Sequence, residues 1–281
     1  MKTKYLFMAT LCLSGIILGS CEKKSNKANS EEPEIVKRLE IVGGVLPGTF
    51  STSANQKVQF SQGNLQYLGQ TDTWRFAEQQ YDTIGDANKN ISSSCSNWID
   101  LFGWGTGYNP TKTDTDYKKY SYFNDWGLNP ISNGGNKANT WRTLSKDEWD
   151  YLFNNRTNAR NLRGCAKVNN KNGYILLPDN FVLPNGVSFQ ADAKKPSENT
   201  YTINQWIKME IAGAVFLPNA GSRYNTEISN YECNYWSSTP NSVSGAINGE
   251  AAAYYMHVSS LQVGYILRTY GLAVRLVKDV Q

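Results

Sequence analysis

Hydrophobic and polar positions alternate in short runs along most of the chain, a pattern that predicts β-strands. In the N-terminal part, apolar positions alternate with polar ones over 58–60, 65–68 and 74–76, and turn residues at 61–64 and 69–72 separate these runs. This spacing predicts a small antiparallel meander. Further strand-like runs follow at 174–177, 214–217, 235–238, 252–258, 263–268 and 272–277. The last three are joined by short turns, which predicts a C-terminal antiparallel sheet.

Two short stretches carry helix-start signals instead. Ser145 is a predicted N-cap, Glu148 completes a capping box with it, and apolar residues follow over 149–153. Residues 202–205 open a second short helix, which Gly213 closes. We therefore expect two short helices set among many strands.

Composition limits the class of protein. With 12% aromatic residues and 19% charged residues, the chain is neither a multi-span membrane protein nor a long disordered segment. The 30 asparagines and 23 glycines indicate many turns, and residues 82–140 carry enough aromatic rings to predict long ordered loops. The net charge is +4, and removal of the first twenty residues, which hold Lys2 and Lys4, leaves +2. That is too small to favour a nucleic-acid partner.

The N-terminal residues have the pattern of an export signal. Two lysines precede the apolar run 6–18, and small residues stand before Cys21. Residues 18–21, LGSC, resemble the lipobox of bacterial lipoproteins, in which the cysteine carries the lipid. We therefore predict a signal peptide at 1–20, a flexible tether at 21–39 and a single domain at 40–281 that includes the meander. The lipid implies a membrane attachment in the cell envelope, as an outer-membrane lipoprotein, with the periplasmic or surface-facing orientation left open.

Several segments resemble known families. Residues 141–149, WRTLSKDEW, resemble the RLPT-x-x-EW helix start of the formylglycine-generating enzyme superfamily, and residues 271–277, GLAVRLV, are similar to its closing G-x-x-V-R-x-V strand. Pieces that resemble secreted major paralogous-domain proteins and lipoproteins of Bacteroidetes and Fibrobacter are 58–67, 98–105, 216–223 and 235–239. The resemblance implies an α+β, C-type-lectin-like domain with a mixed, largely antiparallel sheet, two short helices and long ordered loops.

The residues do not predict an enzyme. The family's paired reactive cysteines near the C-terminus are reduced to Cys233, and His257, the only histidine, lies within a strand-like run. The candidate carboxylates show no spacing that selects a glycosidase pair: Asp100, Asp125, Asp147, Glu148, Asp179 and Glu250. An envelope carbohydrate-active hydrolase remains an alternative, as does a structural or adhesion subunit, including one diversified near its C-terminus.

The sequence predicts no metal site and at most one disulfide. No cysteine or histidine spacing suits zinc, so no metal site is assigned, although oxygen ligands in the loops leave Ca²⁺ open. After export, Cys95, Cys165 and Cys233 allow at most one disulfide, with the pairing undetermined. Thr83 lies in a short Asp-Thr-aliphatic pattern that resembles the O-glycosylation signal of Bacteroidetes envelope proteins.

The main functional hypothesis is a non-catalytic module that binds a glycan or protein ligand. Aromatic and amide side chains interleave near the C-terminus, and such surfaces combine ring contacts with adaptable hydrogen bonds. In the C-type-lectin-like fold the long loops and the C-terminal sheet face the ligand, which implies the candidate ligand-binding residues Tyr224, Asn225, Tyr231, Trp236, Tyr255, Tyr265 and Arg268. Arg275 lies in the closing strand and is expected to make a structural pair instead.

Overall fold

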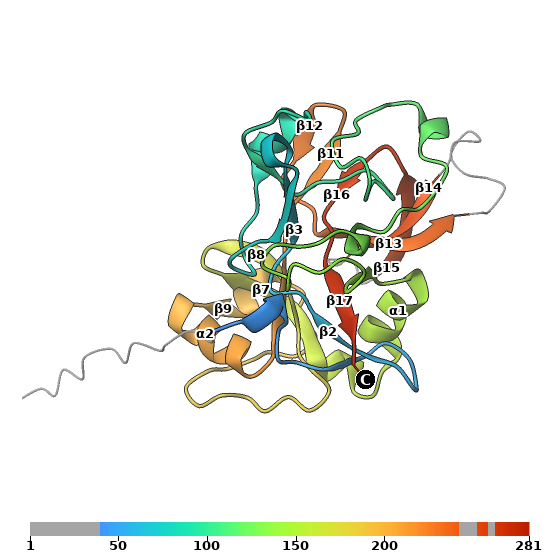
Figure 1. Cartoon of the computed structure of the whole chain (residues 1–281). Coiled ribbons are helices and arrows are strands. Elements are labelled where there is room, and N and C mark those ends of the chain that lie inside the picture. The colour runs from blue at the N-terminus through green and yellow to red at the C-terminus, as the bar shows by residue number, and fades with distance from the viewer. Residues whose placement is uncertain (1–39, 242–251, 258–261, 281) are drawn as a thin grey trace, which may run out of the picture. The chain divides into compact units, whose positions relative to one another are not determined.

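In the computed structural model, which describes residues 40–241, 252–257 and 262–280, two short α-helices begin at the predicted caps (Figure 1). Helix α1 (Lys146–Asp150) has a complete capping box between Ser145 and Glu148 and continues as a π-helical turn, Tyr151–Asn155. Helix α2 (Ile203–Ile211) is capped by Thr202 and Gln205 in the same way. The predicted α+β class is confirmed.

The described strands form five small sheets within one unit, Val36–Gln281. Pairing is antiparallel in all of them except between β7 and β9. In strand order, the two larger sheets are β1 (Phe50–Ser51), β2 (Lys57–Phe60), β17 (Leu276–Asp279) and β6 (Arg142–Thr143); and β10 (Val215–Pro218), β8 (Lys171–Leu176), β7 (Arg163–Val168) and β9 (Thr200–Tyr201).

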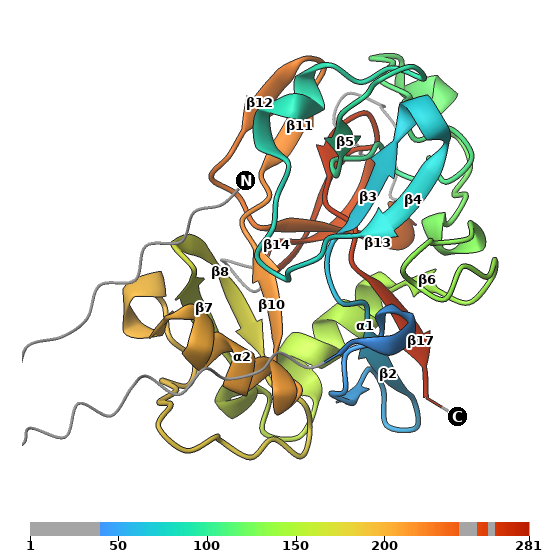
Figure 2. The ribbon, with the colours of Figure 1, turned by 60° about the vertical axis from the view of Figure 1, so that its left-hand side comes forward.

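Three smaller sheets complete the unit. They are β12 (Glu227–Ser229), β11 (Ser222–Tyr224) and β16 (Gly271–Leu272); β13 (Asn234–Asn241), β14 (Ala252–His257) and β15 (Gln262–Leu267); and β4 (Thr73–Phe76), β3 (Leu65–Leu68) and β5 (Trp98–Ile99). Helix α2 packs on β7, β8 and β10 through Trp206 and Met209. Figure 2 shows this helix next to the three strands. Helix α1 packs against β13, β14 and β15.

The predicted meander is only partly correct. Strands β3 and β4 form the expected hairpin, with Leu65 opposite Phe76. Strand β2, however, does not pair with β3; it pairs with β17 from the far end of the chain, with Phe60 opposite Val277 (Figure 1). Alternation identifies which side chains are buried, but partner choice depends on packing between segments distant in sequence.

The predicted C-terminal sheet also needs correction. Its strands β14 and β15 pair as expected, but the third strand is β13 and not residues 272–277. The closing stretch divides into β16 and β17, which enter two other sheets. Every residue of 271–277 is buried, so this segment runs between sheets instead of lying at the edge of one.

The expected structural role of Arg275 is realised through a bridging amide. Its Nη2 donates to Gln80 Oε1 at 2.9 Å, and Gln80 Nε2 donates to Glu210 Oε1 at 3.1 Å. All three side chains are buried. Because a buried charge is costly unless it is hydrogen-bonded, this chain of contacts ties the closing strand to helix α2.

The long segment 82–140 is ordered, as predicted. It contains the 3₁₀ turns η3 (Gly85–Lys89), η4 (Tyr117–Lys119) and η5 (Trp126–Leu128). Trp104 and Trp126 are buried in the same core cluster as β3 and β4. The glycine-rich stretch 103–107 is thus an aromatic loop and not the start of a phosphate-binding helix.

Candidate functional site

Two of the predicted ligand-binding residues are buried and cannot bind a ligand directly. Trp236 has no exposed surface, and its Nε1 donates to the Phe102 carbonyl. Arg268 is 8% exposed; its guanidinium carbon lies 4.2 Å from the centre of the Trp104 ring, and its Nη1 donates to the Tyr120 carbonyl at 2.9 Å. Trp236 is buried because β13 has core on both faces, with Tyr235 in one cluster and Trp236 in another, whereas Arg268 follows β15 and is covered by Trp104 and the segment at Tyr120.

The remaining predicted residues do not form one site. Tyr255 lies opposite Gly264 in the β14–β15 pair. Tyr265 is the residue after Gly264, so its side chain projects from the face opposite to that of Tyr255. Tyr224 and Asn225 lie at the tip of the β11–β12 hairpin, where Tyr224 stacks on Tyr270 with ring centres 4.8 Å apart. Tyr231 follows the other end of β12. Tyrosines near in sequence are thus distributed over several surfaces.

Tyr231 borders a pocket of about 520 Å³. This pocket is lined by Tyr231, four asparagines and residues near η3. Tyr231 is 89% exposed. We call it the amide pocket and define it by Thr83, Asp86, Asn170, Lys171, Asn172, Asn219, Asn230 and Tyr231.

Two hairpin features position the asparagines. Strands β7 and β8 are joined by a two-residue turn, Asn169–Asn170, in which both residues have positive φ, as a type I′ turn requires. Beyond it, the Asn219 backbone N–H donates to the Asn172 carbonyl at 2.9 Å, which aligns the two side chains along one wall. The Asn219 side chain donates to the Tyr231 carbonyl at 3.3 Å. The tyrosine segment is therefore fixed to the amide wall.

Gly221 allows the close approach of that segment. Its φ is +82°, and a Cβ built on it would lie 1.9 Å from the Ser229 carbonyl oxygen. Its N–H donates to the Glu232 carbonyl at 2.9 Å. Only glycine meets both requirements without displacing the backbone beside the pocket.

The opposite wall is held by a buried carboxylate. Asp100 Oδ2 accepts a hydrogen bond from the Ile84 N–H at 3.0 Å, and Asp100 Oδ1 accepts one from Asn88 Nδ2 at 2.8 Å. Asn88 Nδ2 also donates to the Gly85 carbonyl. Burial raises the pKa of Asp100 to about 6, although these hydrogen bonds act in the opposite direction. Asp100 therefore holds the Thr83–Asp86 wall and does not face a substrate.

Charge within the amide pocket is nearly balanced. Asp86 and Lys171 are of opposite sign, and Asp86 Oδ1 lies 3.1 Å from Lys89 Nζ. The remaining polar side chains are the asparagine amides and the hydroxyls of Thr83 and Tyr231, all of which both donate and accept hydrogen bonds. A neutral ligand rich in hydroxyl groups matches this lining, and the exposed Tyr231 ring supplies a flat face for stacking.

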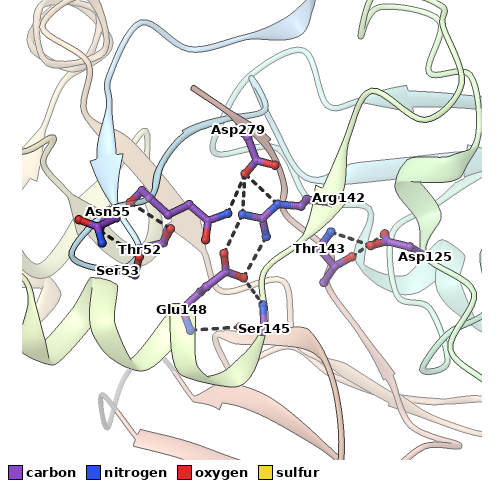
Figure 3. Close-up of polar contacts among 10 residues, drawn as sticks. Thr52, Ser53, Asn55, Asp125, Arg142, Thr143, Ser145, Glu148 and Asp279 are labelled. Atoms are coloured by element: carbon purple, nitrogen blue, oxygen red, sulfur yellow. Dashed lines mark hydrogen bonds and ion pairs between the residues drawn. The ribbon is translucent and has the colours of Figure 1, made fainter. Parts of the chain in front are cut away.

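Of the other candidate carboxylates, Asp125, Glu148 and Asp179 make structural contacts, whereas the Asp147 side chain is 90% exposed and pairs with Lys146. In Figure 3, Arg142 lies between Glu148 and Asp279: Nη1 and Nη2 donate to the two Glu148 oxygens at 2.9 and 2.7 Å, and Nη2 donates to Asp279 Oδ1 at 2.7 Å. Asp125 accepts from the Thr143 N–H and hydroxyl at 2.9 and 2.8 Å. We call the five residues Asp125, Arg142, Thr143, Glu148 and Asp279 the arginine junction.

Electrostatics in the arginine junction follow from those contacts. The hydrogen bond from Arg142 holds the pKa of Asp279 below its usual value. Outside the junction, Asp179 accepts from Ser51 and pairs with Arg156 at 3.2 Å. Glu250 lies outside the described residues. No two of these carboxylates stand open on a common cleft in the part of the chain that the structure describes.

The structure also places the cysteines, the histidine and the candidate glycosylation site. Cys95, Cys165 and Cys233 are all free thiols, with Cys165 and Cys233 buried. Among the described residues, no group of three or more metal-ligating side chains of the His, Cys, Asp and Glu type occurs. His257 lies partly buried in β14. Thr83 lines the amide pocket, and its glycosylation stays a prediction.

Sequence reasoning missed most of the amide pocket. Asn170, Asn172 and Asn219 belong to turns or strand ends, and the abundance of asparagine was attributed to turns alone. Their convergence depends on β8 and β10 pairing and on Tyr231 returning beside them. The consecutive asparagines at 169–170 were the one local signal, since they predict a tight hairpin.

No family model, curated protein or solved structure matches the chain. Within the described residues, no helix has the length and apolar character needed to cross a membrane. The function must therefore be inferred from the geometry of the amide pocket and from the sequence resemblance.

Proposed function

We propose that the chain is a non-catalytic, lipid-anchored protein of the cell envelope that binds a neutral glycan in the amide pocket. The observation that carries this proposal is a pocket whose lining contains four asparagines and an exposed tyrosine. Sugar hydroxyls pair with amide donors and acceptors, while the apolar face of a sugar ring stacks on an aromatic one. The proposal narrows the predicted ligand surface to the neighbourhood of Tyr231.

A C-type-lectin-like fold is part of the same proposal. Its support is the resemblance of 141–149 and 271–277, two segments that lie in one α+β unit. The first segment contains the capped start of α1, and the second supplies β16 and the beginning of β17. Function is argued here from the pocket, because folds of this kind carry many unrelated activities.

The binding proposal is favoured over the hydrolase alternative by the state of the carboxylates. A glycosidase needs two carboxyl groups facing the sugar from opposite sides. Asp86 is the only acid among the described residues that line the amide pocket, and it pairs with Lys89. Asp100 and Asp125 are committed to backbone N–H groups.

Anchoring rests on Cys21, which lies outside the described residues. Two or more acyl chains give stable membrane attachment, whereas one gives only marginal attachment. We expect Cys21→Ser to move the protein from the membrane fraction to the soluble fraction of lysed cells. Unchanged membrane partition of that variant would contradict the lipid anchor.

Ligand binding is tested first with a glycan array probed with the detergent-solubilised full chain. We expect signal on neutral oligosaccharides and conversion of none of them to shorter products on prolonged incubation. Product formation would favour the hydrolase, and signal confined to envelope proteins spotted on the same array would favour a protein ligand.

A further inference from the structure

A second hollow lies in the long loop between β5 and α1. It measures about 110 Å³, compared with about 520 Å³ for the amide pocket, so it has room for one terminal group of a ligand. No acidic side chain is among the described residues that line it. Its lining includes four aromatic rings and two lysines: Trp104, Tyr108, Tyr120, Tyr122, Lys112 and Lys119. We call this hollow the lysine pocket.

The lysine pocket has a fixed floor and an open rim. Trp104 and Tyr120 are buried, and Trp104 Nε1 donates to the Ser237 carbonyl at 2.9 Å. Tyr108 and Tyr122, by contrast, are 70% and 82% exposed. Exposed tyrosine rings next to a fixed aromatic floor offer apolar faces to a sugar ring without any rearrangement of the core.

Two lysines belong to the lining of this pocket. Lys112 Nζ lies 4.3 Å from the centre of the Tyr120 ring and donates to the Lys119 carbonyl. Lys119 Nζ lies 2.7 Å from Asp114 Oδ1, and its side chain is more than half exposed. The Lys119–Asp114 pair is therefore a surface pair of low strength, which a better-placed anion can replace.

Two arginines add positive charge behind the aromatic floor. The Arg268 guanidinium stacks on the Trp104 ring. Arg223 is 1% exposed and interacts electrostatically with Tyr120; among the described residues, its Nε and Nη2 have no hydrogen-bond acceptor. A buried guanidinium without a matching acid makes the local potential positive.

We propose that the lysine pocket binds a carboxylate-bearing sugar, with the sugar ring against the tyrosine rim and the carboxylate on Lys119 and Lys112. The ligand class follows from the aromatic faces, which suit a pyranose ring, and from two lysines in a lining without an acid, since Asp114, the partner of Lys119, lies outside that lining. This site is separate from the proposed glycan site and does not depend on it. Together the two would let one chain hold a glycan that carries both neutral and acidic units.

The test is calorimetric titration of the full chain, in detergent at low salt, with glucuronate, glucose and acetate. We expect glucuronate to bind measurably more tightly than either glucose or acetate, and to lose affinity as salt is added. Acetate as strong as glucuronate would mean a bare anion site, and glucose as strong would mean that the lysines play no part. Either result, or no glucuronate binding, overturns the proposal.

Neighbouring lysines provide a matched control. We expect Lys119→Met to weaken glucuronate binding about three- to fivefold. Lys118→Met, one residue away, exposed and outside the lining, should leave it unchanged. Asp114→Asn should strengthen binding, because it releases the Lys119 ammonium.

Equal effects of the two lysine variants, or weaker binding by Asp114→Asn, would contradict the proposed site. Tyr231→Ala should not change the glucuronate affinity. A negative result in this titration therefore leaves the amide-pocket proposal unaffected. Failure of the amide-pocket proposal likewise leaves the lysine-pocket proposal unaffected.

Discussion

The arginine junction and the amide pocket are both built from polar side chains, but they differ in whether the hydrogen-bond partners of those side chains belong to the chain itself. Each gathers polar side chains from segments distant in sequence: β6, α1 and β17 in the first, and the β7–β8 turn, the loop after β10 and η3 in the second. In the junction the donors of Arg142 meet acceptors of the chain itself. In the pocket the amides border a hollow of about 520 Å³.

This difference separates stability from binding. Polar groups whose partners belong to the chain lower the free energy of the folded state, and replacing one leaves the other unsatisfied. Polar groups that face a hollow are hydrated, so replacing one should change ligand affinity and leave stability nearly unchanged. Each of the following variants tests one side of this comparison.

The largest expected effect concerns the core below the junction. Trp149 is fully buried behind the α1 capping box, and its Nε1 donates to the Trp236 carbonyl. We expect Trp149→Ala to lower the free energy of unfolding by about 3–5 kcal/mol, because it leaves a cavity. Urea unfolding followed by circular dichroism measures this, and a loss below about 1 kcal/mol would show that α1 is not docked as described.

The next effect is a pH dependence from the wall of the amide pocket. The pKa of Asp100 is about 6 in the folded protein, against 3.8 for the free side chain. The native state therefore binds more protons between these values, so stability should be greatest at low pH and fall as pH rises from about 4 to 6.

The test of this effect compares the wild type with Asp100→Asn, so that the other carboxylates cancel. Each tenfold change in proton affinity corresponds to about 1.4 kcal/mol, so the stability of the wild type relative to the variant should fall by roughly 2 kcal/mol from pH 4 to pH 7. A difference that is constant with pH, or one that grows as pH rises, would contradict the buried position of Asp100.

A smaller effect tests the cap at the junction. Ser145 Oγ accepts a hydrogen bond from the Glu148 N–H at 3.3 Å. Ser145→Ala should therefore cost about 1 kcal/mol. The exposed Ser96 is the control, since Ser96→Ala should stay within about 0.5 kcal/mol of the wild type. Equal values for the two variants in the same urea experiment would mean that the cap does not hold the helix.

What the sequence predicted well was local. The capping boxes at Ser145 and Thr202 lie within four residues, and the β3–β4 hairpin lies within twelve, so propensity and spacing are sufficient. The partner of β2 comes from more than two hundred residues away, which no local pattern encodes.

The candidate site shows the same limit. The resemblance to C-type-lectin-like folds implies a ligand at the C-terminal sheet and therefore at Trp236, yet β13 has core on both faces. Tyr231 is exposed, its ligand binding stays a prediction, and its neighbours Asn170, Asn172 and Asn219 come from other segments. Residue type indicated the chemistry, and only the strand pairing brought the groups together.

The most direct test of the account uses two exposed tyrosines. Tyr231 borders the amide pocket, whereas Tyr224 lies at the hairpin tip outside it. Affinity for the strongest neutral glycan on the array is measured by calorimetry for Tyr231→Ala and Tyr224→Ala, alongside the thermal midpoint of each. We predict that Tyr231→Ala weakens binding about tenfold, the loss of roughly 1.4 kcal/mol, with an unchanged thermal midpoint, and that Tyr224→Ala retains wild-type affinity. Equal affinities for both variants, or a Tyr231→Ala protein that loses stability together with binding, would contradict the claim that this pocket is the binding site.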